Sequence, residues 1–450
     1  MKKVDVLVIG GSAAGLVTAL TGKSHYPEKD FLVVRKEEKV VVPCGIPYIF
    51  GSLENSGQNV IPDSKLDNLD VDLLIGEVTG VNTEDKVCQL ADGTAVGYDK
   101  LVLAIGSHPI VPGWLEGADL DNVFTVPKNK AYLDDMLEEL DDKEKIVVVG
   151  GGFIGVELSD ELNKRGKEVT VVELLPHVLN AVFDEELAVE AEELLKARGV
   201  NVATGSGVQA LVGNGKVEGV ELQNGSSLPA EAVILSMGYR PNTALAQDAG
   251  IPTNEIGFIR VDQYMRTDVP DVFAVGDCAE KRDFITNRPI GAMLASTACA
   301  EARITGMNLF QLEAVRTFTG TISNFATAFG EQAFGVAGVT ESTAREEGFE
   351  IITASFEGVD HHPGKLPGTH KQKVKLVVAK DSGLILGGSV AGGSTVGEVV
   401  NVIGLAIQNR MTVSEVMTAQ IGTHPLLTAP PTAYPLIKAA ELALKKISQN

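Results

Sequence analysis

An apolar run, a glycine-rich turn and a helical stretch follow one another twice along the chain. In the first copy, a strand at residues 4–9 leads into a helix that reaches about residue 23, through the turn Gly10-Gly11-Ser12-Ala13-Ala14-Gly15. In the second copy, a strand at residues 145–149 leads into a helix that reaches about residue 165, through Gly150-Gly151-Gly152-Phe153-Ile154-Gly155. A further apolar strand follows each helix, at residues 31–34 and 168–172. Two such βαβ units predict two nucleotide-binding sites.

The remaining pattern predicts an α/β protein of three domains. Strands are expected at residues 100–105, 217–222, 232–237 and within 258–277, and helices at 132–140 and 185–198. From about residue 320 the pattern changes to strands at 372–378 and 384–389 and helices at 396–408, 412–419 and 435–446. We therefore predict a Rossmann-type domain from residues 1–112 and 241–320, a second from 113–240, and an α+β C-terminal domain from 321–450.

A glycine turn between a strand and a helix lets the backbone approach a pyrophosphate, whose charge lies at the helix N-terminus. One such turn is a weak signal, because tight strand-to-helix connections also favour glycine. Two turns, each in a full βαβ context, argue against a purely structural role. The predicted dinucleotide contacts are Gly10, Ser12, Ala13, Ala14 and Gly15 in the first turn, and Gly150, Gly152, Phe153, Ile154 and Gly155 in the second.

An acidic residue distinguishes the two turns. Glu173 ends the strand of the second copy, 23 residues after Gly150. At that spacing a carboxylate accepts hydrogen bonds from the adenosine ribose, and it repels a 2′-phosphate. The second site is therefore expected to prefer NADH over NADPH. The first copy departs from this rule, because its strand ends in Arg35-Lys36 and Ser12 stands in place of the second glycine. We expect a dinucleotide there as well, with Arg35 and Lys36 among its neighbours.

Composition limits the classes of partner. The 450 residues suffice for two or three domains, and the 44% apolar and 22% charged fractions are ordinary for a globular protein. A formal net charge of −22, without a compensating basic run, argues against nucleic acid and against an anionic membrane. No apolar run is long enough for a membrane helix, and the start lacks a secretory cleavage site. The cysteines are scattered without metal-ligand spacing, so we expect no metal site and a reducing, cytoplasmic location: Cys44, Cys88, Cys278 and Cys299.

With these residues in view, the chain resembles the pyridine nucleotide-disulfide oxidoreductases nearly end to end. The matching pieces are the two glycine turns, YDKLVLAIGS (98–107), Glu157, MGYRPN (237–242) and TDVPDVFAVGDCA (267–279). The resemblance implies that the first turn holds the ADP half of FAD and that Asp277 contacts the ribityl chain of the flavin. It also implies NAD on the middle domain and a homodimer formed by the C-terminal domain. Gly106 and Gly238, within these motifs, are further expected cofactor neighbours.

The segment Val42-Pro43-Cys44-Gly45-Ile46-Pro47-Tyr48 places the chain within that family. Glutathione- and lipoamide-type members carry two cysteines spaced CxxxxC here, whereas this chain has Cys44 alone. It therefore resembles the single-cysteine branch, which includes CoA-disulfide reductases, NADH-dependent persulfide or sulfur reductases, and NADH oxidases and peroxidases. The leading hypothesis is an NADH-dependent reductase of CoA-disulfide, CoA-persulfide or polysulfide. The alternatives are an oxidase or peroxidase that uses a Cys44 sulfenic acid, and a non-catalytic flavoprotein redox sensor.

The chemistry of Cys44 follows from its surroundings in the sequence. Pro47 can open a helix just past the cysteine, and a helix N-terminus lowers a thiol pKa. The thiolate could then attack a disulfide or persulfide sulfur. The other cysteines match no redox motif and are expected to be small core residues. Lys23 and His25 are candidates for contact with CoA phosphates, with solvated surface as the alternative.

The C-terminal domain departs from the single-cysteine pattern. Where many such members carry tyrosines, this chain has Asp360-His361-His362-Pro363-Gly364 and Thr423-His424-Pro425. The second segment resembles the His-Pro motif of two-cysteine members, whose histidine donates a proton at the partner subunit's site. His424 is therefore the expected second catalytic residue, because histidine titrates near neutrality. A histidine hydrogen-bonded within its own domain is the alternative, and His361 and His362 are reserve candidates.

Overall fold

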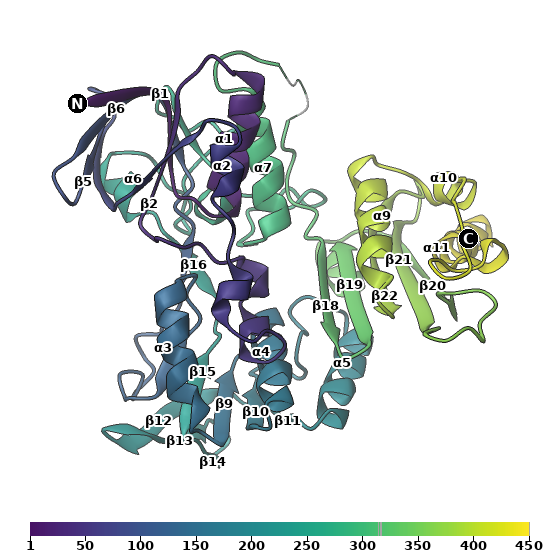
Figure 1. Cartoon of the computed structure of the whole chain (residues 1–450). Helices are drawn as coiled ribbons and strands as arrows, with labels where there is room; N and C mark the ends of the chain where they lie inside the picture. The colour runs from purple at the N-terminus through teal and green to yellow at the C-terminus, as the bar shows by residue number, and fades with distance from the viewer. Residues whose placement is uncertain (314, 316, 450) are drawn as a thin grey trace.

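The computed structural model describes residues 1–313, 315 and 317–449; residues 314, 316 and 450 of the predicted domains lie outside the described residues. The N-terminal unit is built on a sheet in the order β3-β2-β1-β6-β5-β4, with β17 paired to β6. Strand β2 is buried throughout, and β1 is mostly buried from Val4 onward, as continuous apolar runs predict for parallel strands. Helices α1 (Ala13–His25) and α7 (Ala295–Met307) pack on each other beside this sheet (Figure 1). The strands are β1 (Lys2–Ile9), β2 (Phe31–Arg35), β3 (Asp72–Ile75), β4 (Val78–Asn82), β5 (Val87–Leu90), β6 (Ala95–Leu103) and β17 (Val272–Ala274), and the short helices of this unit are α2 (Ser64–Asp67) and α6 (Ala244–Asp248).

The middle unit repeats the βαβ arrangement on a second parallel sheet, in the order β11-β10-β9-β15-β8. A small antiparallel sheet, β12-β13-β14, lies beside it. The elements of the parallel sheet and its helices are β8 (Val123–Thr125), α3 (Lys130–Asp141), β9 (Lys145–Val149), α4 (Phe153–Lys164), β10 (Glu168–Val172), α5 (Glu185–Ala197), β11 (Asn201–Ala203) and β15 (Ala232–Leu235). The antiparallel strands are β12 (Val208–Asn214), β13 (Lys216–Leu222) and β14 (Ser227–Pro229).

The chain crosses between these two units at an antiparallel ribbon of β7 (Ser107–Pro109) and β16 (Tyr239–Pro241). Gly106 and Gly238 lie at its ends with positive φ angles of 68° and 94°. Their carbonyl groups accept hydrogen bonds from the backbone of Asn242 and Ile110, both at 2.9 Å. The ribbon therefore fixes the two nucleotide-binding units to each other at the place where their strands end.

The C-terminal unit is an antiparallel sheet in the order β18-β19-β22-β21-β20, with helices on it. Helix α9 (Val396–Gln408) packs on β19 and β22, and α11 (Pro435–Gln449) packs on β20 and β21. In Figure 1 this unit extends sideways from the other two, with β18 and β19 nearest to α5. The remaining elements are β18 (Phe325–Phe329), β19 (Gln332–Gly338), α8 (Glu341–Glu346), β20 (Ile351–Val359), β21 (Lys371–Ala379), β22 (Ile385–Gly392) and α10 (Val413–Met417). Short 3₁₀ helices occur at η1 (Pro43–Gly45), η2 (Pro47–Phe50), η3 (Ser56–Asn59), η4 (Gly276–Cys278) and η5 (Pro431–Ala433).

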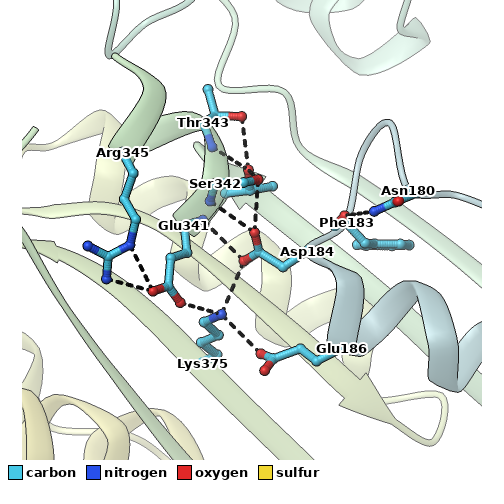
Figure 2. Close-up of polar contacts among 10 residues, drawn as sticks. Asn180, Phe183, Asp184, Glu186, Glu341, Ser342, Thr343, Arg345 and Lys375 are labelled. Carbon is cyan, nitrogen blue, oxygen red and sulfur yellow. Dashed lines mark hydrogen bonds and ion pairs between the residues drawn. The ribbon is translucent and has the colours of Figure 1, made fainter. Parts of the chain in front are cut away.

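A cluster of charges joins the middle and C-terminal units, and Figure 2 shows it in close-up. The Lys375 ammonium of β21 lies 3.2 Å from Asp184, 3.0 Å from Glu186 and 2.8 Å from Glu341. Asp184 precedes α5, yet its carboxylate accepts the backbone N–H groups of Glu341 and Ser342, both at 3.1 Å, at the start of α8. An acid of the middle unit thus satisfies the helix N-terminus of another unit.

The predicted fold class is confirmed: two Rossmann-type units and a separate α+β C-terminal unit. Differences are local. The strand expected within residues 258–277 is reduced to β17, because Met265 and Asp271 adopt positive φ angles and turn the chain. The helix expected at 412–419 is the shorter α10, since Thr412 is its N-cap in a capping box with Glu415. Among the described residues, no helix combines the length and apolar character that a bilayer span requires.

Candidate active site

Both glycine turns leave a helix N-terminus open to a ligand. At the second turn, a methyl group on Gly155 would lie 1.8 Å from the carbonyl oxygen of Gly150, so close packing of strand and helix requires glycine there. At Gly152, in contrast, an added methyl group would meet nothing within 4 Å. Neither Ser12 before α1 nor Gly152 before α4 caps its helix with a side chain, and no acid lies in either first turn. Both N-termini therefore suit a pyrophosphate.

The first turn lies against the side chain of Arg35. A methyl group on Gly11 would lie 2.7 Å from Arg35 Cδ, so the arginine stem covers this part of the turn. The Arg35 guanidinium is buried and forms a bidentate pair with Asp63, at 2.7 and 3.0 Å. Lys36 is exposed and pairs with Glu77 at 2.9 Å. Arg35 thus borders the predicted FAD turn while its charge is already neutralised, and Lys36 points to the surface.

The second turn opens on a cavity of about 300 Å³. Gly150, Gly152 and Glu173 line it, together with Trp114 and Leu174. The Glu173 carboxylate accepts the backbone N–H groups of Gly151 at 2.7 Å and of Leu175 at 2.8 Å. These bonds fix the acid at the rim of the glycine turn. No Lys, Arg or His is among the described residues that line the cavity.

Asp277 lies at the centre of a polar group between the two units. Its carboxylate accepts hydrogen bonds from the Ser107 hydroxyl, at 2.7 Å, and from the Lys128 ammonium, which is also 2.8 Å from Ser107 Oγ. Burial acts to raise the pKa of Asp277, but the charge and hydrogen bond of Lys128 outweigh it, so the pKa is lowered. Sequence reasoning missed Lys128, which belongs to no motif.

A buried ion pair supports the backbone beside Asp277. Glu301 of α7 accepts the N–H of Gly276 at 2.7 Å, and Lys281 donates to the carbonyl of Ala279 at 3.0 Å. The two side chains are fully buried and 3.5 Å apart. Burial raises the pKa of Glu301 to about 7. The pair therefore fixes the backbone turn that carries Asp277.

Cys44 lies in η1, between Pro43 and Gly45, and is exposed. Asn59 holds this segment in place. Its side-chain amide donates to the backbone carbonyl of Val42 at 3.0 Å, and its backbone carbonyl accepts the N–H of Val42 at 2.8 Å. The helix opened by Pro47 is only the four-residue η2. The expected lowering of the thiol pKa is wrong for this chain. The surrounding protein and the Glu157 charge raise the pKa of Cys44, and Lys128 only partly opposes them.

Glu157 of α4 is the acid whose charge does most to raise the pKa of Cys44. Burial raises its pKa to about 7, although the Thr327 hydroxyl of β18 donates to it at 2.8 Å. The same carboxylate acts on Tyr48, whose pKa is raised by burial first and by Glu157 second. Cys44, Glu157 and Thr327 come from three different units of the fold. The site is therefore assembled where those units meet, at a carboxyl group that titrates near neutrality.

The histidines of the C-terminal unit have different surroundings. His424 is exposed, and its Nδ1 accepts the backbone N–H of Leu426 at 3.2 Å. His361 is paired through Nδ1 with the buried carboxylate of Asp360 at 2.7 Å. His362 Nδ1 lies 3.1 Å from the carbonyl oxygen of Thr428. The Asp360 carboxylate orients the His361 ring, as in many proton-donating histidines. His424, in contrast, is exposed to solvent.

The other predicted residues are placed as follows. Cys88 and Cys278 are fully buried, as expected, but Cys299 of α7 is only partly buried, so the expectation of a core residue is wrong there. Lys23 is buried and donates to the carbonyl of Lys29 at 2.9 Å. His25 pairs with Glu313 at 2.9 Å. Neither Lys23 nor His25 is a free phosphate ligand in this fold.

Comparison with known proteins agrees with this geometry. Residues 4–302 match the family described as pyridine nucleotide-disulphide oxidoreductase, and residues 325–434 match its dimerisation domain. An NADH oxidase of Methanocaldococcus jannaschii is 31% identical, with 99% of each chain covered. An NAD(P)H coenzyme A polysulfide/persulfide reductase of Pyrococcus horikoshii is 34% identical, over 87% of this chain and 88% of that one. The solved structure of an NAD-dependent persulfide reductase from A. fulgidus has a TM-score of 0.90 and 29% identity, covering 99% of this chain and 84% of that one.

The chain belongs to the pyridine nucleotide-disulphide oxidoreductase family. It is an enzyme of that family, which uses FAD and NAD(P)H, so the alternative of a non-catalytic sensor is set aside. The open helix N-termini at the two glycine turns fit the pyrophosphates of these two dinucleotides.

Proposed function

We propose that this enzyme uses NADH to reduce a small-molecule disulfide, persulfide or polysulfide, with CoA-disulfide and CoA-persulfide as the preferred candidates. The observation that carries the proposal is an exposed single thiol, Cys44, whose ionisation is influenced by Glu157, Lys128 and Asp277. Glu157 lies in α4, which follows the second glycine turn, and Asp277 follows Gly276, which lies against Ala14 of the first turn. The relatives, which include persulfide reductases, support the same substrate class.

The residues of this chain would divide the work. Gly10, Ser12, Ala13, Ala14 and Gly15 would hold the FAD pyrophosphate, with Arg35, Lys36, Gly106 and Asp277 nearby. Gly150, Gly152, Phe153, Ile154 and Gly155 would hold that of NADH, with Glu173 on the ribose and Gly238 in the connecting ribbon. The acid at Glu173 and the absence of cations among the described cavity residues favour NADH over NADPH.

FAD, when bound, carries the two electrons of the hydride from NADH to the sulfur centre. The thiolate of Cys44 would attack one sulfur of the acceptor, form a mixed disulfide and release the other sulfur as a thiol after protonation. The two electrons from NADH would then cleave that mixed disulfide into the Cys44 thiolate and, with one proton, the second thiol. For a disulfide RSSR the balance is one NADH and one proton consumed for two thiols formed. For a CoA-persulfide the products are CoA and hydrogen sulfide.

The proton source completes the proposal. We propose His424, contributed by the partner of a homodimer formed through the C-terminal unit, as the acid that protonates the departing thiolate. His361 is the reserve candidate, because Asp360 orients its ring. The thiol chemistry also requires a reducing compartment, which favours a cytoplasmic location.

A second function is favoured by other relatives, since proteins named NADH oxidase match almost the whole chain. In that case Cys44 would react with a peroxide and become a sulfenic acid. One experiment separates the two: NADH consumption by the holoenzyme, measured anaerobically with CoA-disulfide or CoA-persulfide and, in parallel, under air without them. Faster turnover of the sulfur acceptors supports the reductase. Turnover only under air or with peroxide would reject it.

Mass spectrometry of the purified protein tests the substrate class independently, through the group attached to Cys44. A CoA adduct indicates a CoA-linked disulfide, an added sulfur indicates a persulfide, and an added oxygen indicates peroxide chemistry. The nucleotide preference is tested by comparing kcat/KM for NADH and NADPH. Equal kcat/KM values for NADH and NADPH would refute the role proposed for Glu173.

A further inference from the structure

Trp114 is a large apolar residue in an exposed position. It is the single tryptophan of the chain, and the residue is 60% exposed to water. Leu174, which follows Glu173, is 62% exposed. Exposed large apolar residues that gather at one place mark binding surfaces more often than isolated ones do. These two residues come from distant parts of the sequence and border the same cavity.

The cavity lining has polar and apolar parts. The glycine turn and the Glu173 carboxylate belong to the polar part, where a pyrophosphate and a ribose fit. Trp114, Leu174, Val208 and Met237 supply apolar wall. A dinucleotide whose ribose meets Glu173 must place its adenine beyond that acid, where Leu174 is the next residue.

The backbone next to Trp114 is held by hydrogen bonds of the residues that follow it. Leu115 is 5% exposed and donates its N–H to the carbonyl of Pro112 at 3.1 Å. Glu116 forms a bridge with Ala210 of β12, and its carbonyl accepts the N–H of Leu211 at 2.9 Å. The backbone that carries Trp114 is thus anchored at the two residues that follow it. A tryptophan side chain has only two rotatable bonds, so it loses little conformational freedom when a flat ligand binds.

We propose that Trp114 stacks on the adenine ring of NADH and, with Leu174, determines how tightly the enzyme binds the adenosine half of its electron donor. The proposal rests on the second glycine turn being the NADH site. Base–aromatic stacking contributes to affinity through the π-face of the base and through the apolar area removed from water. The nicotinamide half lies elsewhere, so Trp114 is a binding residue for adenosine and takes no part in the redox step.

The kinetic test compares donors with and without adenosine. For the holoenzyme, Trp114→Ala should raise the KM for NADH about tenfold with little change in kcat, a loss in the range measured for base stacking. The KM for reduced nicotinamide mononucleotide, which lacks adenosine, should not change. Trp114→Phe should restore most of the affinity. The matched control is Ile256→Ala, because Ile256 is 53% exposed and lies outside the cavity lining.

The single tryptophan also gives a readout without turnover. Titrating wild-type holoenzyme with AMP should change the Trp114 emission saturably, and Ile256→Ala should behave in the same way. An unchanged emission on saturation with AMP would overturn the proposal, as would an equal rise in KM for both donors or an unchanged KM for NADH in Trp114→Ala. Because AMP binding needs no sulfur acceptor, failure of the proposed reductase activity leaves this result intact. Equal use of NADPH would likewise refute only the role of Glu173, since both donors carry adenine.

Discussion

Lys375→Met removes the ammonium that joins three carboxylates across the boundary between the middle and C-terminal units. Lys375 is 8% exposed, and its partners Asp184, Glu341 and Glu186 have side-chain exposures of 15%, 27% and 44%. Methionine keeps most of the length of the lysine side chain and an apolar stem of similar shape. The variant therefore isolates the loss of charge, and it leaves three acids facing one another (Figure 2).

The magnitude follows from burial. Removing one partner of a fully buried ion pair costs about 3–5 kcal/mol, whereas exposed pairs contribute about 0–1 kcal/mol. Glu186 is largely solvated, and Asp184 keeps the N–H groups of Glu341 and Ser342. We expect the free energy of opening this boundary to fall by about 2 kcal/mol at neutral pH. That corresponds to about thirtyfold faster amide exchange at the start of α8.

The assay is hydrogen exchange followed by mass spectrometry on peptides that cover residues 340–346. The control is Lys371→Met on the same strand, because Lys371 pairs with Glu357 at 3.0 Å while both are exposed, at 82% and 51%. That control should change exchange by less than about threefold. Equal protection in wild type and Lys375→Met, or an equal effect in Lys371→Met, would refute the role assigned to the cluster.

The pH dependence supplies a second check. Burial acts to raise the pKa of Asp184, but the N–H groups of Ser342 and Glu341 and the Lys375 charge outweigh it, so the folded-state pKa lies below the usual value. A lowered carboxyl pKa adds stability that is present above the unfolded value, about 4, and is lost as the pH falls through the folded value. The difference between wild type and Lys375→Met should therefore shrink as the pH is lowered from 7 to below 4. A difference that is constant over that range contradicts the electrostatic explanation.

Three further changes test the catalytic site. Cys44→Ser should keep its flavin and its reduction by NADH but lose the sulfur reaction by at least about a thousandfold, since the attacking thiolate is gone; wild-type rates of acceptor reduction would show that Cys44 is not the nucleophile. Glu157→Gln should shift the pH profile of Cys44 alkylation by iodoacetamide to lower pH, because the Glu157 charge raises the pKa of the thiol; an unchanged profile or a shift to higher pH would contradict this coupling. His424→Ala, compared with His361→Ala in single-turnover experiments, should slow sulfur reduction about a hundredfold with unchanged flavin reduction. If only His361→Ala slows sulfur reduction, the proton donor is His361, paired with Asp360, and not His424. If sedimentation shows a fully active monomer, a proton donor from the partner subunit is excluded.

The repeated βαβ units could be predicted from the sequence because their signals are local. Strands β9 and β10 and helix α9 have the predicted bounds, since apolar runs and a glycine turn define both ends of an element. The connecting ribbon was not predicted as strands, because β7 and β16 are three residues each and pair across a large separation in sequence. The predicted domain boundaries and site residues remain predictions.

The ionisation of Cys44 could not be predicted from the sequence. Pro47 is a local feature, and it correctly indicated a helical turn, but η2 is too short to act as a strong dipole. Burial contributes most to the raised thiol pKa, and among the charged groups Glu157 raises it and Lys128 lowers it, although both lie far from Cys44 in the sequence. Glu157 has a pKa of about 7, whereas the pKa of the thiol is raised above its usual value, so the carboxyl group becomes charged before the thiol ionises as the pH rises. The reactive state of Cys44 therefore depends on how the three units pack, because that packing determines both the burial of the thiol and the charges that act on it.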